Sequence, residues 1–167
     1  MKSVKKLGYL MPFILPALWV AGYYGGGIWN YATLIFAFGL IPVLDAWVGV
    51  DTQNPEKEQE KSLSDEKFYK LVTFSWAFLQ FGLVIWACYV VSLQKMETYE
   101  LIGFVLSTMT VTGGVGITVA HELGHKNTKI EQFLAKIILA TVCYRHFYIE
   151  HNRGHHVNVA TPLDPAT

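Results

Sequence analysis

The sequence predicts an all-α integral membrane protein, because apolar residues are abundant, charged residues are scarce and four long segments are almost free of charge. Of its 167 residues, 52% are hydrophobic and 16% are charged, whereas soluble domains carry about 25% charged residues. The formal net charge is zero, so the composition does not suggest binding to a nucleic acid. We therefore expect a helical bundle whose solvent is the lipid bilayer.

Four apolar segments are long enough to be transmembrane helices. They comprise residues 7–24, 28–50, 71–93 and 101–120, and Asp45 is their one charged residue. A bilayer core about 30 Å thick requires about 20 apolar residues in a helix. Only Gly25, Gly26 and Gly27 separate the first two segments, which predicts a tight helical hairpin. The fourth segment is rich in small residues and is expected to lie centrally in the bundle.

The lysines predict the orientation of these helices, because cytoplasmic loops carry an excess of Lys and Arg. With four membrane-spanning helices, nine lysines lie on one side of the membrane, namely Lys2, Lys5, Lys6, Lys57, Lys61, Lys67, Lys70, Lys126 and Lys129. The other side receives only Lys95. We expect the N-terminus and the whole segment after His121 in the cytoplasm, with residues 51–67 as a solvated connector.

A further helix is predicted after the fourth apolar segment. Thr128 and Glu131 match a capping box, which marks a helix start. Apolar residues then recur at helical spacing, namely Ile130, Phe133, Leu134, Ile137 and Ile138. The uncharged stretch of residues 137–144 is too short to span a bilayer. We therefore expect an amphipathic helix on or partly within the cytoplasmic interface.

All six histidines lie between residues 121 and 156, and five of them form two boxes. His121 and His125 form an HxxxH box, and residues four apart share one face of a helix. His151, His155 and His156 form an HxxxHH box, in which α-helical spacing groups His151 with His155 and directs His156 about 100° away. The two boxes predict a metal centre, and imidazole suits iron, zinc and copper.

The remaining histidine and four carboxylates are candidates for a supporting role. We interpret His146 as structural, or as a residue that orients a metal-bound imidazole. Acidic residues often orient such imidazoles, and the candidates are Asp45, Glu122, Glu150 and Asp164. Asp45 stands near the cytoplasmic end of the second segment, where a carboxylate is costly.

Two alternatives to an oxygen-dependent metal centre follow from the residues. HELGH at 121–125 also fits HExxH, in which two histidines bind zinc and the glutamate is the general base of a protease. Asp164 could be the third zinc ligand. That interpretation leaves His151, His155 and His156 unexplained, so we prefer a centre that uses both boxes. The second alternative is a helical membrane module with vestigial boxes.

The sequences of these motifs resemble those of one protein family. HELGHK at 121–126, HFYIEHNRGHH at 146–156 and VATPLDPAT at 159–167 are similar to motifs of the membrane-bound alkane 1-monooxygenases. PVLDAWVGVDTQNP at 42–55 is similar as well, and the resemblance runs from about residue 28 to the end. These enzymes are part of the membrane di-iron superfamily of desaturases and hydroxylases.

The resemblance implies a function for the chain. It implies two non-haem iron ions, with His121, His125, His151, His155 and His156 among their ligands. It also implies O₂-dependent hydroxylation of linear alkanes to 1-alkanols in the bacterial inner membrane. Electrons would come from rubredoxin, which an NAD(P)H-dependent reductase reduces. A fatty acyl desaturase or lipid hydroxylase of the same superfamily is the alternative within this class.

The resemblance also implies that residues 1–167 are an incomplete catalytic domain, with its histidine-box region at 121–167. The family has six transmembrane helices and further histidine motifs downstream, so we expect the remaining metal ligands outside this chain. Bulky residues that could line a substrate channel among the helices are Trp29, Phe36, Phe38, Trp47 and Trp76.

Overall fold

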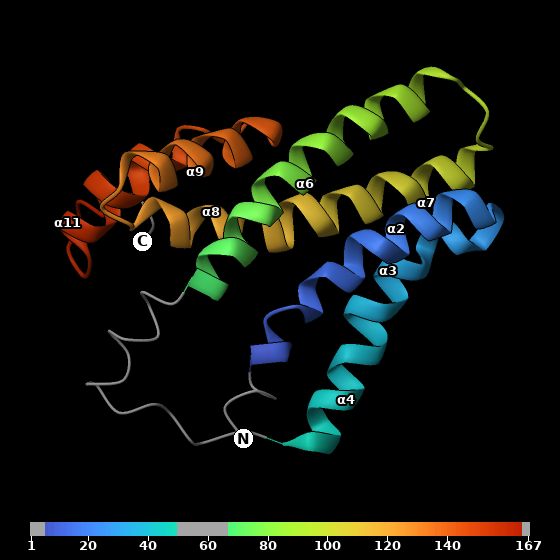
Figure 1. The fold of residues 1–167 in the computed structure, drawn as a ribbon, viewed down its shortest axis with the longest axis horizontal. Helices are drawn as coiled ribbons and strands as arrows, with labels where there is room; N and C mark the ends of the chain where they lie inside the picture. The colour runs from blue at the N-terminus through green and yellow to red at the C-terminus, as the bar shows by residue number, and fades with distance from the viewer. Residues whose placement is uncertain (1–5, 50–66, 165–167) are drawn as a thin grey trace. The chain divides into compact units, whose positions relative to one another are not determined.

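A computed structural model describes residues 6–49 and 67–164 (Figure 1), and every regular element within these ranges is helical. Four segments are long and apolar enough to cross a membrane, namely Lys6–Gly25, Gly27–Val48, Lys67–Ser92 and Thr98–Gly124. They coincide closely with the four predicted segments, so the predicted all-α membrane fold is confirmed. Apart from Lys67, the predicted connector lies outside the described residues.

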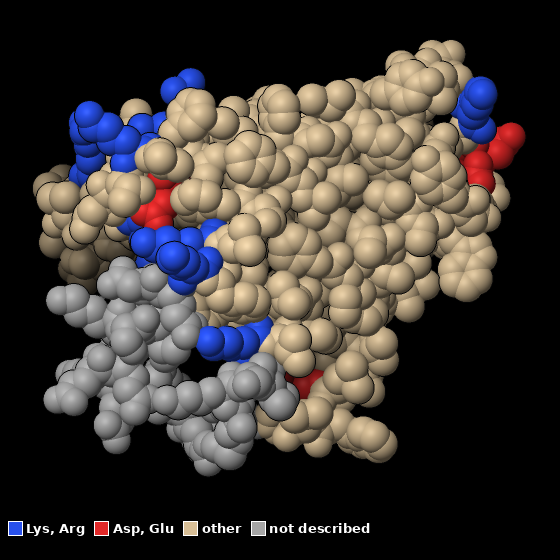
Figure 2. All heavy atoms as spheres, viewed as in Figure 1, with Lys and Arg blue, Asp and Glu red and all other residues tan. Residues whose placement is uncertain are grey.

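The surface of these segments is largely apolar. Figure 2 shows that uncharged residues make up most of the visible surface. Only 6% of the apolar window of Gly27–Val48 is buried within the chain, whereas the value for Thr98–Gly124 is 33%, the highest of the four. The fourth segment therefore has the most contacts with its neighbours, in agreement with its small residues.

Contacts within the chain divide it into two compact units. One comprises Met1–Val72 and Cys88–Val111, and the other comprises Thr73–Ala87 and Thr112–Thr167. All five box histidines lie in the second unit.

A helical hairpin forms the start of the first unit. The short helix η1 (Met11–Phe13) leads into α2 (Ile14–Gly25), and the chain reverses at Gly26 and Gly27, whose φ angles are 67° and 54°. Glycine adopts such angles without steric cost. A Cβ atom on Gly22 would lie 2.4 Å from the carbonyl oxygen of Trp29. The glycines therefore allow the close approach that the sequence predicts.

The returning half of the hairpin contains four consecutive helical pieces. They are η2 (Gly27–Tyr31), α3 (Ala32–Leu34), the π-helix η3 (Ile35–Leu40) and α4 (Ile41–Val48). Helix α7 (Thr98–Met109) packs against the hairpin. The Ser107 hydroxyl donates to the carbonyl of Asn30 at 2.8 Å, and the rings of Trp19 and Phe104 lie 5.5 Å apart.

The second unit combines the middle of α6 (Lys67–Ser92) with the elements that follow α7. These are the π-helix η4 (Thr110–Gly116), α8 (Ile117–Gly124), α9 (Lys129–Thr141), α10 (Phe147–Ile149), the π-helix η5 (Glu150–His155) and α11 (His156–Asn158). Helix α9 lies alongside α8 (Figure 1), so the chain turns back on itself between the two boxes.

Helix α9 begins as the capping box predicts, and the chain buries one side of it. Thr128 caps the helix, because its side chain accepts a hydrogen bond from the Glu131 N–H. The buried apolar residues of α9 are Leu134, Ala135, Ile138 and Leu139. Ile130 and Phe133, which the sequence placed on the apolar face, are exposed. Exposed apolar residues are compatible with a helix that meets the bilayer interface, and that placement stays a prediction.

Candidate metal centre

The first histidine box lies where α8 ends. His121 is in the last turn of α8, and His125 is its C-terminal cap. The Nε2 atoms of the two rings are 3.1 Å apart, and the ring centroids are 4.5 Å apart. The spacing of four residues thus brings the two imidazoles to one face, as predicted.

The second box has a different geometry from the one that α-helical spacing predicts. His151 and His156, five residues apart, have Nε2 atoms separated by 3.0 Å. The reason is that Glu150–His155 form a π-helix, in which the backbone repeat runs from i to i+5. The expectation that His151 pairs with His155 through their metal-binding edges is therefore wrong. The two rings do stack, with centroids 5.5 Å apart.

The two boxes meet at one point. His125 Nε2 lies 3.1 Å from His151 Nε2, so the second box contacts the first directly. Within the described part of the chain, one group of donor atoms converges in this way, and all its atoms lie within 4.8 Å of one another. The group consists of His121, His125, His151 and His156.

The donor set fits a metal ion better than it fits a hydrogen-bond network. A ring nitrogen has either one proton or one lone pair, so His125 Nε2 and His151 Nε2 cannot each bond two other Nε2 atoms well. Four lone pairs directed at one cation satisfy all the rings. Two nitrogens at about 2.1 Å from an ion and at right angles would be about 3.0 Å apart, close to the separations between neighbouring rings.

Two rings of the group, those of His125 and His151, are held in the form that binds metals. Burial is the largest cause that lowers the pKa of His151, and together with neighbouring imidazoles such as His121 and His156 it brings this pKa to about 4. Burial also lowers the pKa of His125, again with help from His121 and His156. Both rings are therefore neutral near pH 7, and a neutral imidazole has a lone pair to donate.

His155 lies beside this group and has its own partner. Its Nδ1 is 2.9 Å and 3.0 Å from the two carboxylate oxygens of Asp164, which is buried. An ionised carboxylate only accepts hydrogen bonds, so Nδ1 carries the proton and donates it. The Nε2 atom of His155 is consequently the nitrogen with a free lone pair.

The other predicted supporting residues are placed differently. Glu122 is exposed, and its Oε1 lies 3.3 Å from His121 Nδ1. His146 is exposed and packs edge-on against Tyr144 at 4.7 Å. Glu150 is exposed at the start of η5. Asp45 is exposed in α4 of the first unit, so its role stays a prediction.

One residue of this site was not predicted from the sequence. The ring of Phe147 stacks on His151, with centroids 4.9 Å apart and planes 15° apart. It limits the rotation of that imidazole. The signal in the sequence is an aromatic residue four positions before a box histidine, which places it one helical turn away.

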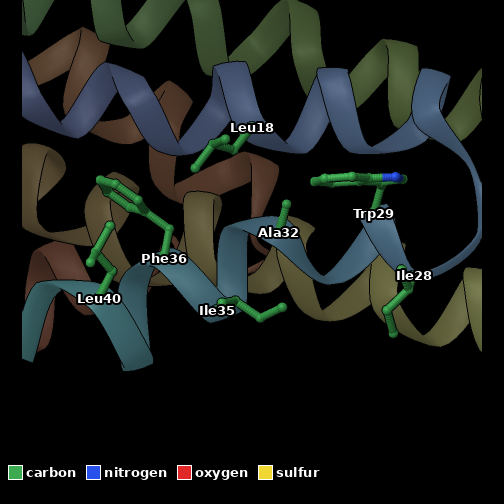
Figure 3. A pocket seen from close by; sticks show the side chains of 7 residues that line it. All are labelled: Leu18, Ile28, Trp29, Ala32, Ile35, Phe36 and Leu40. Carbon is green, nitrogen blue, oxygen red and sulfur yellow. The ribbon is translucent and has the colours of Figure 1, made fainter.

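The first unit contains an apolar cavity of about 290 Å³ (Figure 3). Its lining consists of Leu18, Ile28, Trp29, Ala32, Ile35, Phe36 and Leu40. Two of the predicted channel residues, Trp29 and Phe36, are in this lining. Phe38 and Trp47 are 70% and 89% exposed, and Trp76 is buried in the second unit. The predicted channel role of all five stays a prediction.

Fold and site together define a helical membrane protein with a cluster of imidazoles at the end of its last described span, and the comparisons with known proteins agree. Residues 98–167 match the fatty acid desaturase family. The chain is 37% identical to an alkane 1-monooxygenase of Pseudomonas putida, over 98% of this chain and 42% of the relative. It is 35% identical to alkane 1-monooxygenase 1 of Alcanivorax borkumensis, over 95% of this chain and 40% of the relative.

The predicted resemblance to the alkane 1-monooxygenases is thereby confirmed. It covers almost the whole chain rather than only the part from residue 28. The chain spans less than half the length of these curated relatives.

Proposed function

We propose that this protein hydroxylates the terminal carbon of linear alkanes in the membrane, using O₂ and non-haem iron. The observation that carries the proposal is the convergence of four histidine Nε2 atoms from two boxes at the end of a segment long and apolar enough to span a membrane. The alkane 1-monooxygenase relatives support the reaction and the substrate class.

The five box histidines have distinct roles in the proposed centre. His121, His125, His151 and His156 would hold one iron ion through their converging Nε2 atoms. His155 would offer its Nε2 as a ligand to a second iron ion, because Asp164 holds the proton on Nδ1. When bound, iron would accept electrons and reduce O₂ to an oxidant able to attack an unactivated C–H bond.

The protein's own residues orient the ligands. Phe147 holds the plane of His151, and Glu122 accepts a hydrogen bond from His121 Nδ1. Partners of this kind fix the tautomer and orientation of a metal-bound imidazole. The apolar lining around Trp29 and Phe36 would suit an alkyl chain, which has no polar group to hydrogen-bond.

The electrons for the reaction would come from another protein. We propose rubredoxin as the donor, reduced by an NAD(P)H-dependent reductase. The lysine distribution supports a cytoplasmic position for the histidine boxes in a bacterial inner membrane. An apolar substrate would then enter from the bilayer, while the electron donor would approach from the cytoplasm.

A desaturase or lipid hydroxylase is the second candidate, because residues 98–167 match the fatty acid desaturase family. The zinc-protease alternative fits the structure less well. Asp164 could be its third zinc ligand beside His121 and His125, but the carboxylate of Asp164 lies 2.9 Å from His155 Nδ1 instead.

The test is a product assay with the complete protein in lipid nanodiscs, supplied with rubredoxin, its reductase and NADH. Under ¹⁸O₂, a linear alkane should yield a 1-alkanol that contains ¹⁸O. A parallel reaction with a fatty acyl substrate should yield no unsaturated product. If the fatty acyl substrate is desaturated and no alkanol forms, the protein is a desaturase and the proposed function is wrong.

A further inference from the structure

A single buried glutamine links the segments that carry the two histidine boxes. Gln80 stands in the middle of α6 and is 1% exposed. Its Oε1 accepts a hydrogen bond from Trp76 Nε1 at 2.9 Å, and its Nε2 donates to Thr141 Oγ1 at 2.8 Å. The Thr141 hydroxyl donates in turn to the carbonyl of Ile138 at 2.6 Å. These directed bonds hold the Gln80 amide in one orientation.

The amide also lies directly against the helix that carries the first box. Gly116 is the last residue of the π-helix η4 and precedes His121 by five positions. A Cβ atom on Gly116 would lie 2.1 Å from Gln80 Oε1. Position 116 therefore requires glycine if the Gln80 amide is to remain in place.

Thr141, the other hydrogen-bond partner of Gln80, lies where the backbone turns towards the second box. Thr141 is the last residue of α9, and the reversal that follows includes Cys143 with a φ of 55°. The Tyr144 N–H closes the turn by donating to the carbonyl of Leu139 at 2.9 Å. The place where α9 ends therefore determines where the segment bearing His151 begins its return.

These hydrogen bonds matter more in a membrane than in water, because hydrocarbon offers polar groups no other partner. Helix α6 is long and apolar enough to cross a bilayer. In hydrocarbon, a polar group at the middle of such a helix must find its partner within the protein. The last carbonyls of α9 likewise lack partners within their own helix. An apolar side chain at position 80 would fill the same space but would leave the Thr141 hydroxyl and the Trp76 N–H without these bonds.

We propose that Gln80 is a positioning residue for the metal centre. Its amide fixes the end of helix α9 against the base of α8, and so sets the approach of the second histidine box to the first. The inference rests on the proposed metal site, and it adds a residue more than 40 positions away in sequence.

The test compares Thr141→Val, which removes the hydroxyl at almost constant volume, with Thr141→Ser, which keeps it. Each is made in the complete protein in lipid nanodiscs, stripped of metal and titrated with Co²⁺. We expect Thr141→Val to weaken Co²⁺ binding about tenfold and to alter the visible absorption of bound Co²⁺. Thr141→Ser should retain both properties. The thermal unfolding midpoint of the metal-free protein reports whether each variant folds.

Two further variants complete the design. Thr110→Val is the matched control, because Thr110 is half-buried and its hydroxyl donates to the carbonyl of Leu106 in the same helical segment. Gly116→Ala should reproduce the effect of Thr141→Val by displacing the Gln80 amide. If Thr141→Val does not fold, Gln80→Met replaces it, since methionine keeps the length and loses both bonds.

The outcomes separate this inference from the proposed function. If the unaltered protein binds Co²⁺ and the folded Thr141→Val and Gly116→Ala variants bind it equally well with the same spectrum, Gln80 has no positioning role. The proposal is also overturned if Thr141→Ser does not retain the visible absorption spectrum of bound Co²⁺ seen in the unaltered protein. If the unaltered protein itself binds no Co²⁺, the proposed metal site fails, and the positioning role fails with it.

Discussion

His156 Nε2 lies 3.0 Å from His151 Nε2, although the two residues are five positions apart and His155 is the one that α-helical spacing would place beside His151. The π-helix Glu150–His155 accounts for this pairing. It separates the two adjacent histidines, so that His156 joins the first box and His155 binds Asp164.

The different positions of these two histidines predict different losses of metal. His156→Ala removes one of four converging nitrogens and should reduce the affinity of the four-histidine site by at least about tenfold. His155→Ala should leave that affinity close to its original value and reduce the total metal content instead. Metal titration with elemental analysis distinguishes the two losses. Equal effects of both variants on the same site would contradict the π-helical arrangement.

Asp164 should matter through the proton that it holds on His155. Asp164→Asn replaces the carboxylate by an amide that can present its NH₂ group to Nδ1, so the ring can adopt the wrong tautomer. We expect a loss of about 10-fold to 100-fold in the affinity of the second metal position. Glu150→Gln is the control, because that carboxylate is exposed in the same segment. A metal content in Asp164→Asn equal to that of the control would refute this role.

Glu122 separates the proposed function from the zinc-protease alternative. A protease would need this carboxylate as its general base, and Glu122→Gln would abolish its activity. In the structure, Glu122 is exposed and contacts His121 Nδ1, on the ring edge away from the converging Nε2 atoms. We therefore expect Glu122→Gln to retain metal and a large part of the alkane hydroxylation rate. Loss of all activity with full metal content would count against the account.

The metal-free protein should lose stability in mild acid. The pKa of His151 is lowered to about 4 in the folded chain, from an ordinary value of 6.5. His151 therefore binds a proton more readily in the unfolded chain than in the folded one. The stability that the neutral His151 ring contributes is complete above pH 6.5 and is lost as the pH falls towards 4. Thermal unfolding across this range measures the loss. His151→Gln should show a shallower decline, and an equally steep decline in that variant would assign the effect to other groups.

The helices were predictable because hydrocarbon imposes a simple rule on the sequence. Each membrane-spanning segment must be apolar over about 20 residues, and the breaks between segments are marked by residues such as Gly26 and Gly27. The pairing of His121 with His125 was predictable for a similar reason, since four residues make about one helical turn.

The second box could not be predicted in the same way, because π-helical backbone has no signature in residue spacing. An extra residue in the turn exchanges His155 for His156 without any change in the pattern HxxxHH. The role of Gln80 is also invisible in the sequence, since its contacts with Thr141 and Gly116 join residues that are distant along the chain. The side of α9 that is buried could not be predicted either, because it is set by tertiary contacts such as those with α8.

The metal content of the complete protein is the most direct test of the central claim. The protein would be purified without oxygen in lipid nanodiscs, and its iron and zinc would be measured per chain by elemental analysis. The account predicts about two irons and little zinc, as a centre built from both histidine boxes requires. One zinc per chain without iron would contradict it and would favour the HExxH protease instead.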